Sequence, residues 1–234
     1  MRFTIEHLKK SFTKQEVLKD INFTFEPGHI YGLLGRNGAG KTKLFNCINN
    51  DISFDGGRCF ITEDNGTERK LAAEDIGYVL SEPSVPEFLT GSEFIRFYMD
   101  VNKKYIHDVK PESEYLKMVA IKEEDSHKLM KEYSHGMKNK MQMLVNFISK
   151  PPILLLDEPL TSLDVVVAEE MKEILRQISS DCIIILSTHI MDLALDLCDE
   201  IVLLNRGELS ELRRDDLSND DFRARIIDAL KEEN

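Results

Sequence analysis

The sequence predicts an α/β fold with a mostly parallel sheet. Short, strongly apolar segments recur along the chain and alternate with helical patterns, as in a parallel sheet covered by helices on both faces. One such segment, 30–34, leads directly into a glycine-rich loop and then a helix. The N-terminal part alternates apolar and polar residues, which favours strands with one buried face.

The local pattern of the first half predicts its elements in order. Residues 2–6 and 21–25 predict strands with one buried face, and the wholly apolar run 30–34 predicts a strand buried on both. A helix is expected over 41–49. Asp55-Gly56 and Asn65-Gly66 are hairpin-turn signals on either side of a short strand at 59–62.

The second half begins with a strand at 76–80, after which strand patterns stop. Charged helical patterns follow Pro83, and Thr90-Gly-Ser-Glu93 marks a helix start. Strands return at 153–156, 183–186 and 201–204, with helices between them, and a short helix is expected at 219–231. We therefore expect one domain over 1–210, with a helical subdomain inserted at about 84–149, and a charged C-terminal tail over 211–234.

Composition narrows the function classes. Thirty Lys and Arg against forty-two Asp and Glu give 234 residues a net charge of −12, which argues against a nucleic-acid partner. No apolar run approaches the roughly 20 residues of a membrane span, and the N-terminus lacks the apolar core of a signal peptide. We expect a cytoplasmic protein that acts on membranes only from the surface.

The four cysteines support the same location. Cys47, Cys59, Cys182 and Cys198 are widely spaced and form no C-x-x-C pair. Buried, reduced thiols are the favoured interpretation over a zinc site or disulfides.

The glycine-rich loop has the composition of a phosphate-binding site. It fits the pattern G-x-x-x-x-G-K-[ST] with the residues Gly35, Arg36, Asn37, Gly38, Ala39, Gly40, Lys41 and Thr42. Glycines let backbone N–H groups surround a β-phosphate, and the positive end of the following helix faces the same anion. Lys41 can reach the β- and γ-phosphates, and the Thr42 hydroxyl can ligate Mg²⁺. The alternative is a glycine-rich turn with no ligand.

Two acids follow the apolar strand at 153–156. Asp157 and Glu158 lie at its C-terminal end, where open α/β sheets bind ligands. Asp157 would hold Mg²⁺, directly or through a water, and Glu158 would polarise an attacking water. The alternative is that the pair begins a solvated loop.

Further motifs accompany the glycine-rich loop and the acid pair. Tyr133-Ser-His-Gly-Met137 precedes the acid pair, Ser162-Leu163-Asp164 follows it, Ser187-Thr-His189 ends the next strand, and Ile76-Gly-Tyr-Val79 lies upstream. In order and spacing, from roughly residue 3 to 210, the chain resembles the ATP-binding cassette ATPases, and most closely the ATPase subunit of bacterial ABC-2 exporters. The resemblance implies a P-loop NTPase core with a mostly parallel sheet, an N-terminal antiparallel β subdomain, an ABC-specific helical subdomain, ATP and Mg²⁺.

The resemblance also implies residue roles. Phe12 falls where the family stacks an aromatic ring on adenine, although a Phe is more often core. His189 matches the histidine that contacts the γ-phosphate and orients water, although a lone His at a strand end is more often structural. The signature segment, Tyr133–Met137, matches the motif that caps the γ-phosphate held by the opposite subunit, and Asp164 matches the loop that joins the two sites. Ser134 suits a helix N-cap.

The sequence departs from the family pattern at four positions. His135 and Met137 replace a glycine and a glutamine of the signature, while Ser134 and Gly136 remain. Lys43 stands where a second hydroxyl is common. Ser81, followed by Glu82, stands where a glutamine usually touches Mg²⁺, and its own hydroxyl is the candidate metal ligand.

The resemblance implies two partners. One is a second ATPase subunit, the same chain or a close relative, so that each Mg·ATP is sandwiched between one phosphate loop and the partner's Ser134 segment. The other is a separate transmembrane permease, which would hold the protein at the inner face of the plasma membrane. Glu82, Glu87, Phe88 and Phe94 could line the docking groove, although the phenylalanines also suit a core. The alternatives are a soluble, non-transport ATPase and a regulatory cassette with weak hydrolysis.

Overall fold

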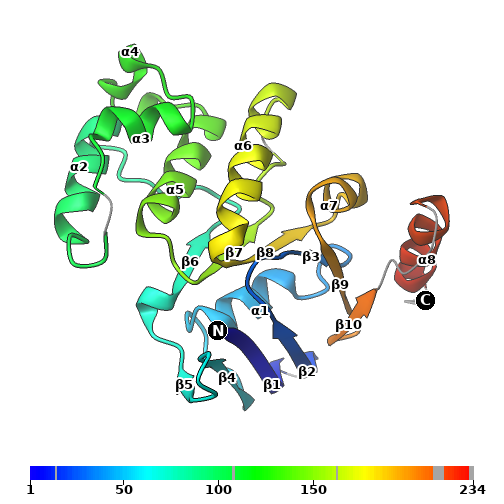
Figure 1. Ribbon diagram of the computed structural model, residues 1–234. Coiled ribbons are helices and arrows are strands. Elements are labelled where there is room, and N and C mark those ends of the chain that lie inside the picture. Colours follow the sequence, from blue (N-terminus) through cyan, green and yellow to red (C-terminus); the bar gives the residue numbers. More distant parts are fainter. Residues whose placement is uncertain (14, 107–108, 162, 213–218, 232–234) are drawn as a thin grey trace.

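The computed structural model describes residues 1–13, 15–106, 109–161, 163–212 and 219–231. In these residues the strands form two sheets (Figure 1). The larger sheet is mostly parallel, and its strands in spatial order are β10 (Glu208–Leu212), β9 (Glu200–Asn205), β3 (Ile30–Leu34), β8 (Ile183–Thr188), β7 (Ile153–Asp157) and β6 (Ile76–Val79). The smaller sheet is antiparallel, in the order β2 (Gln15–Phe25), β1 (Arg2–Phe12), β4 (Gly56–Thr62) and β5 (Glu68–Lys70). The predicted α/β fold with an N-terminal antiparallel subdomain is confirmed.

The helices fall into two groups (Figure 1). The helical subdomain contains α2 (Gly91–Val101), α3 (Glu112–Met118), α4 (Glu123–Ser126) and α5 (His135–Ser149). The other helices are α1 (Lys41–Ile48), α6 (Val165–Ile178), α7 (Met191–Leu197) and α8 (Asn219–Lys231). Short 3₁₀ helices cover Ala73–Asp75, Met130–Glu132 and Ser179–Asp181. Thr90 caps α2, because its side chain accepts a hydrogen bond from Glu93 N, as its sequence predicts.

The central strands are apolar throughout because both of their faces are buried. In β7, Leu154 and Leu156 pack toward the helical side, while Ile153 and Leu155 pack toward α1 and the antiparallel sheet. Successive side chains of a strand point to opposite faces, so two packed layers require a continuous apolar run. α1 lies between the two sheets (Figure 1).

The C-terminal helix α8 packs onto the core. Phe222 and Ile226 are buried in a cluster with Leu34, Ile201 and Leu203 of the central strands. Asn205 also donates a side-chain hydrogen bond of 3.0 Å to the carbonyl of Ala229. The helix expected at 219–231 is therefore present, and its apolar side rests against the parallel sheet.

Three details of the N-terminal sheet differ from expectation. β1 and β2 extend well beyond 2–6 and 21–25, because a bulge at His7, with φ of 51°, shifts the pairing register and interrupts the alternation. Asp55-Gly56 is not a hairpin turn, since β4 begins at Gly56; the Asp55 carboxylate instead accepts from Ser11 N at 2.7 Å and Lys10 Nζ at 3.2 Å. The second signal, Asn65-Gly66, does join β4 to β5.

All four cysteines are free thiols. Burial raises the pKa of Cys47 and Cys182 to about 11 and that of Cys59 and Cys198 to about 12. The thiols are neutral near pH 7, as expected for reduced packing residues.

Candidate active site

The glycine-rich loop joins β3 to α1 at the C-terminal edge of the parallel sheet. Gly38 and Gly40 have φ of 87° and 107°, the left-handed region that favours glycine. A Cβ on Gly35 would lie 2.8 Å from the carbonyl oxygen of Leu204, so that position is closed to side chains as well. The exposed apex of the loop is formed by Arg36, Asn37 and Gly38. With Ala39 and the first turn of α1, this is the anion-binding geometry that the pattern predicts.

Lys41 opens α1 and bends back over the loop. Its Nζ donates to the carbonyl of Gly35 at 2.7 Å and lies 4.0 Å from Glu158 Oε1. Burial lowers the pKa of Lys41, while the nearby charges of Glu158 and Asp157 oppose that shift. The ammonium is therefore held at the loop, between the phosphate cradle and the acids.

Asp157 ends β7 and is almost fully buried. Its Oδ2 accepts a hydrogen bond of 2.7 Å from Thr42 Oγ1, and its other oxygen accepts one from Ser187 Oγ. Thr42 and Asp157 are far apart in the sequence, but β3 and β7 flank β8 and their carboxyl ends meet at one edge. A hydroxyl and a carboxylate of this kind provide the hard oxygen donors that Mg²⁺ prefers.

Glu158 leaves the strand in the left-handed conformation, with φ of 50°. Its side chain therefore points differently from that of Asp157, as expected. Oε1 lies 2.8 Å from His189 Nδ1, and Oε2 accepts from Thr188 Oγ1 at 3.3 Å. The structure thus brings Lys41 together with Glu158 and His189, both of which lie more than a hundred residues further along the sequence.

Two residues that bind this cluster, Ser187 and Thr188, were not predicted as site residues. Ser187 and Thr188 end β8, and the register pairs Asp157 with Ser187. Their hydroxyls bind the carboxylates of Asp157 and Glu158 respectively. The signal that could have identified them is a Ser-Thr pair at the end of a strand expected to lie beside the acid-bearing strand.

Phe12 ends β1 and is outside the hydrophobic clusters of the described core. Its ring is half-buried, and the ammonium groups of Lys10 and Lys43 lie 5.3 and 5.4 Å from its centroid. The structure therefore favours the surface interpretation of Phe12 over the core one. It also places Lys43 beside that ring.

The signature segment caps a helix. Ser134 is the N-cap of α5, and its side chain accepts from Met137 N at 3.2 Å. Asp164 similarly caps α6, accepting from Val166 N and Val167 N at 3.1 Å each. Ser162, part of the same pattern, lies outside the described residues. Within the described chain, no hydrogen bond or ion pair joins Ser134, His135, Gly136 or Met137 to the phosphate loop.

Ser81 is exposed just beyond β6, at the same edge of the sheet. Among the described residues, its hydroxyl makes no hydrogen bond to Asp157 or Thr42. Gln142 of α5 holds the neighbouring backbone instead, donating to Leu80 O at 2.9 Å and accepting from Ser84 N at 3.2 Å. A metal role for Ser81 stays a prediction.

Comparison with known proteins identifies the family. The model of the family described as ABC transporter matches residues 18–161, more than half of the chain. The chain belongs to the ABC transporter family. It is 30% identical over 210 residues to the uncharacterised ABC transporter ATP-binding protein YxlF of Bacillus subtilis, covering 88% of this chain and 69% of YxlF. It is 29% identical to the sulfate/thiosulfate import ATP-binding protein CysA of Nitrosomonas europaea, covering 91% of this chain and 60% of CysA.

Solved structures agree. An ATP-binding subunit of an ABC transporter superposes with a TM-score of 0.79 at 25% identity, covering 100% of this chain and 99% of that one. The dimeric cassette MJ0796, described in a post-hydrolysis state with ADP and Pi, superposes with a TM-score of 0.74 at 22% identity, covering 90% and 99%. The chain is the ATP-binding and ATP-hydrolysing subunit of an ABC transporter, a family whose cassettes work as dimers with separate permease subunits. None of the helices in its described part has the length and apolar character of a membrane span.

Proposed function

We propose that the chain drives an exporter of the ABC-2 type. In this proposal it forms a head-to-tail dimer with a second copy or a close relative, and two Mg·ATP lie between the subunits. The cassette covers residues 1–210, with the helical subdomain at about 84–149, and 211–234 form the tail. ATP binding closes the dimer and hydrolysis reopens it.

The phosphate loop supports the nucleotide part of the proposal. Residues Gly35 to Thr42 would surround the β- and γ-phosphates with backbone amides and the Lys41 ammonium. On binding, Lys41 would exchange its present bond to Gly35 O for phosphate oxygens. Phe12 would stack on adenine, with Lys43 beside it.

The oxygens of Thr42 and Asp157, 2.7 Å apart, fit a Mg²⁺ ion. Ser81 is a third candidate ligand at the same edge. The bound ion would offset the negative charge of the phosphates during transfer. Ser187 keeps the Asp157 carboxylate oriented toward Thr42.

The contact of Glu158 with His189 carries the hydrolytic assignment. Glu158 Oε1 lies 2.8 Å from His189 Nδ1 and 4.0 Å from Lys41 Nζ, at the edge where the γ-phosphate would lie. Glu158 would accept the proton of the attacking water, while His189 would orient that water and contact the phosphate. The acceleration of hydrolysis would come from positioning and charge neutralisation rather than from a covalent intermediate.

The second half of each site would come from the other subunit. Ser134 presents the N-terminus of α5, and Asp164 that of α6, and in the described chain neither bonds to its own phosphate loop. Next to Asp164, Val165 and Val166 are 80% and 68% exposed. Apolar side chains so exposed favour a surface that is covered on dimerisation.

The permease would dock beside the Ser81 loop and the helical subdomain. Phe88 is 77% exposed there, whereas Phe94 packs against the core of the subdomain. Of the two phenylalanines, only Phe88 therefore suits a docking groove, together with Glu82. Glu87 is paired with Lys138 of α5.

The variant Glu158→Gln tests the hydrolytic assignment. It should bind ATP normally, lose at least a hundredfold in turnover, and form an ATP-dependent dimer on light scattering. Glu124→Gln, on the exposed face of the helical subdomain, is the matched control and should behave as wild type. Turnover of Glu158→Gln at the wild-type rate would show that Glu158 is not the base.

A second experiment tests the transport direction. The chain should co-purify from membranes with a hydrophobic subunit, and ATP added to inside-out vesicles of that complex should load substrate into the lumen. Recovery only in a complex without a membrane protein would contradict the proposal. Net movement out of such vesicles would contradict the exporter direction alone.

A further inference from the structure

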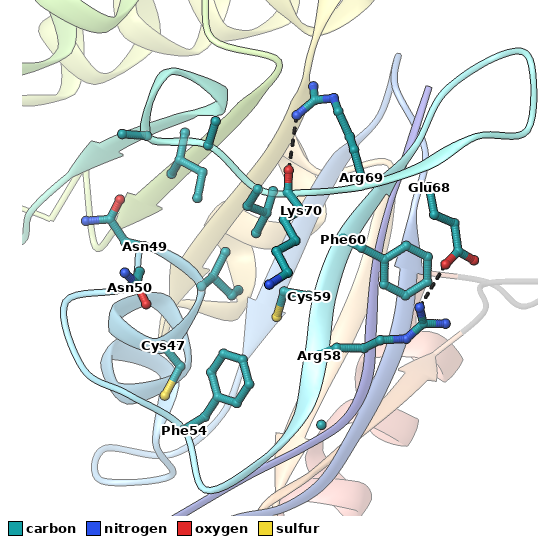
Figure 2. Close-up of a pocket in the computed structure, with 16 residues that line it drawn as sticks. Cys47, Asn49, Asn50, Phe54, Arg58, Cys59, Phe60, Glu68, Arg69 and Lys70 are labelled. Carbon is teal, nitrogen blue, oxygen red and sulfur yellow. Dashed lines mark hydrogen bonds and ion pairs between the residues drawn. The ribbon is translucent and has the colours of Figure 1, made fainter.

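A cavity of about 910 Å³ lies away from the phosphate loop, between the last turn of α1 and the strands β4 and β5 (Figure 2). None of the residues assigned above to nucleotide, metal or signature functions lines it. Its volume lies in the range of small-molecule sites in proteins. Two of its lining residues, Arg58 and Lys70, are exposed, so the cavity opens to solvent.

The walls of this cavity are mainly apolar. Side chains from α1, the following loop, β4, the segment after β5 and the first residue of β6 contribute, and they are Cys47, Ile48, Phe54, Cys59, Phe60, Leu71 and Ile76. The two thiols are neutral, because burial raises the pKa of Cys47 to about 11 and of Cys59 to about 12. The interior therefore suits a hydrocarbon body rather than a metal ion or a sugar.

The cationic groups of the cavity differ in their pairing. Arg58 pairs with Glu6 and Glu68 at 2.8 Å each, and its guanidinium stacks on Phe60 at 4.1 Å. Arg69 is likewise neutralised by acidic neighbours. The charges of Arg58 and Arg69 are therefore already balanced by neighbouring carboxylates.

Lys70 is the exception. Within the described residues its ammonium makes no ion pair or hydrogen bond, and Figure 2 shows its side chain extending from β5 into the cavity toward Cys59. An apolar chamber with one uncompensated ammonium matches a molecule with an apolar body and one negative group. A cationic amphiphile would place like charges together, and a neutral one would leave the ammonium unpaired.

We propose that this cavity binds an amphipathic organic monoanion, with a carboxylate on Lys70 and a hydrocarbon body of about ten to fourteen carbons against Phe54, Cys59 and Leu71, which share one hydrophobic cluster. The site does not depend on which substrate the transporter moves or in which direction. A single ammonium without a helix N-terminus disfavours a phosphate group, which usually gathers several donors.

The absence of tryptophan from the sequence gives a direct assay. Phe54→Trp places a single tryptophan in the cavity wall, and dodecanoate below its micellar concentration is the probe. We expect a saturable change in fluorescence with one binding site per chain. In the same background, Lys70→Gln should weaken dodecanoate binding about three- to fivefold, as for a partly exposed ion pair. Lys104→Gln, an exposed lysine outside the cavity, should leave the affinity unchanged.

Dodecyltrimethylammonium is the charge control and should bind at least tenfold more weakly than dodecanoate. Equal affinity for the two probes, an unchanged affinity in Lys70→Gln, or no saturable response would each overturn the proposal. If Phe54→Trp does not fold, the melting temperature of the unmodified chain replaces fluorescence. It should rise with dodecanoate and rise less in Lys70→Gln, and no rise would overturn the proposal.

Discussion

A buried asparagine of α5 is expected to control the position of the catalytic glutamate. Asn139 is 2% exposed, and its Nδ2 donates to the carbonyl of Pro159 at 2.6 Å. Pro159 follows Glu158, whose backbone already has a left-handed φ of 50°. Glu158 itself is held by its N–H to Ser187 at 3.2 Å and by the bond from Thr161 Oγ1 to Glu158 O, whereas Asn139 holds the carbonyl of the next residue, so Asn139→Ala should loosen the turn just after Glu158.

The magnitude follows from the contact that is lost. Removing the amide leaves the buried Pro159 carbonyl without its side-chain donor, which costs about 1–3 kcal/mol of the free energy of unfolding. For a chain of this size, about 2 kcal/mol lowers the melting temperature by roughly 4–8 °C. A shift of about 1 Å in the Glu158 carboxylate would lower kcat between tenfold and a hundredfold. KM for ATP should stay within about twofold, because the phosphate loop is untouched.

Steady-state ATPase kinetics and thermal unfolding of the same samples give both quantities. Asn146→Ala is the matched control, since Asn146 is also a buried amide of α5 but donates to Gln142 O within its own helix. It should lower the melting temperature and leave kcat near wild type. If Asn139→Ala melts earlier but keeps the wild-type kcat, the amide is only structural and the positioning argument fails.

Three other changes test the remaining parts of the site and the fold. Gly40→Ala should lose most ATP binding and about 1–2 kcal/mol of the free energy of unfolding measured in urea. The reason is that φ is 107° and a Cβ would lie 3.0 Å from Val17 Cγ1. An unchanged ATP affinity would contradict the phosphate-binding role of this glycine. Burial opposes ionisation of Asp75, but hydrogen bonds from Arg69 and a backbone amide lower its pKa below 3.8. The ionised carboxylate therefore stabilises the fold above pH 3.8, and this stabilisation is lost as the pH falls through the pKa of Asp75 in the folded protein. When unfolding is measured as a function of pH, the free energy of unfolding should therefore fall less below pH 4 in Asp75→Asn than in wild type. An equal pH dependence in the two proteins would refute the stabilising pairing of Asp75 with Arg69. Phe12→Ala should weaken ATP binding severalfold while Phe12→Tyr does not, with kcat unchanged in both; equal affinities would leave the ring without a nucleotide role.

The sequence predicts the phosphate loop and the acid pair well because their geometry is local. A buried strand fixes where Lys41 and Asp157 begin their turns, and parallel strands place their carboxyl ends at one edge. The same rule places His189, just after β8, near Glu158, just after the neighbouring β7. The family resemblance supplied the roles of Phe12, the signature segment, Asp164 and His189.

The missed features depend on contacts that no local pattern encodes. The bulge at His7 breaks the alternation of β1, so pattern reading ended that strand early. The exposed edge strands β5 and β10 pair through their backbones and carry mainly polar side chains. Asn139 has no signal in the sequence, because its bond to Pro159 forms only when α5 packs against the loop that follows β7.

The buried amides of α5 have a common explanation. Asn139 and Gln142 are three residues apart and so share one face of the helix. Burying an amide is unfavourable unless it is hydrogen-bonded, and both bond to loop backbone: Asn139 to Pro159, and Gln142 to the Leu80–Ser84 loop at both ends. The first residue of the same helix is capped by Ser134, the segment that would meet the partner's nucleotide. Since a helix moves as a rigid element, any displacement of Ser134 on dimer closure should be carried to the turn of Glu158 and to the loop beside the permease. The amides therefore provide a physical link between the two halves of the composite site.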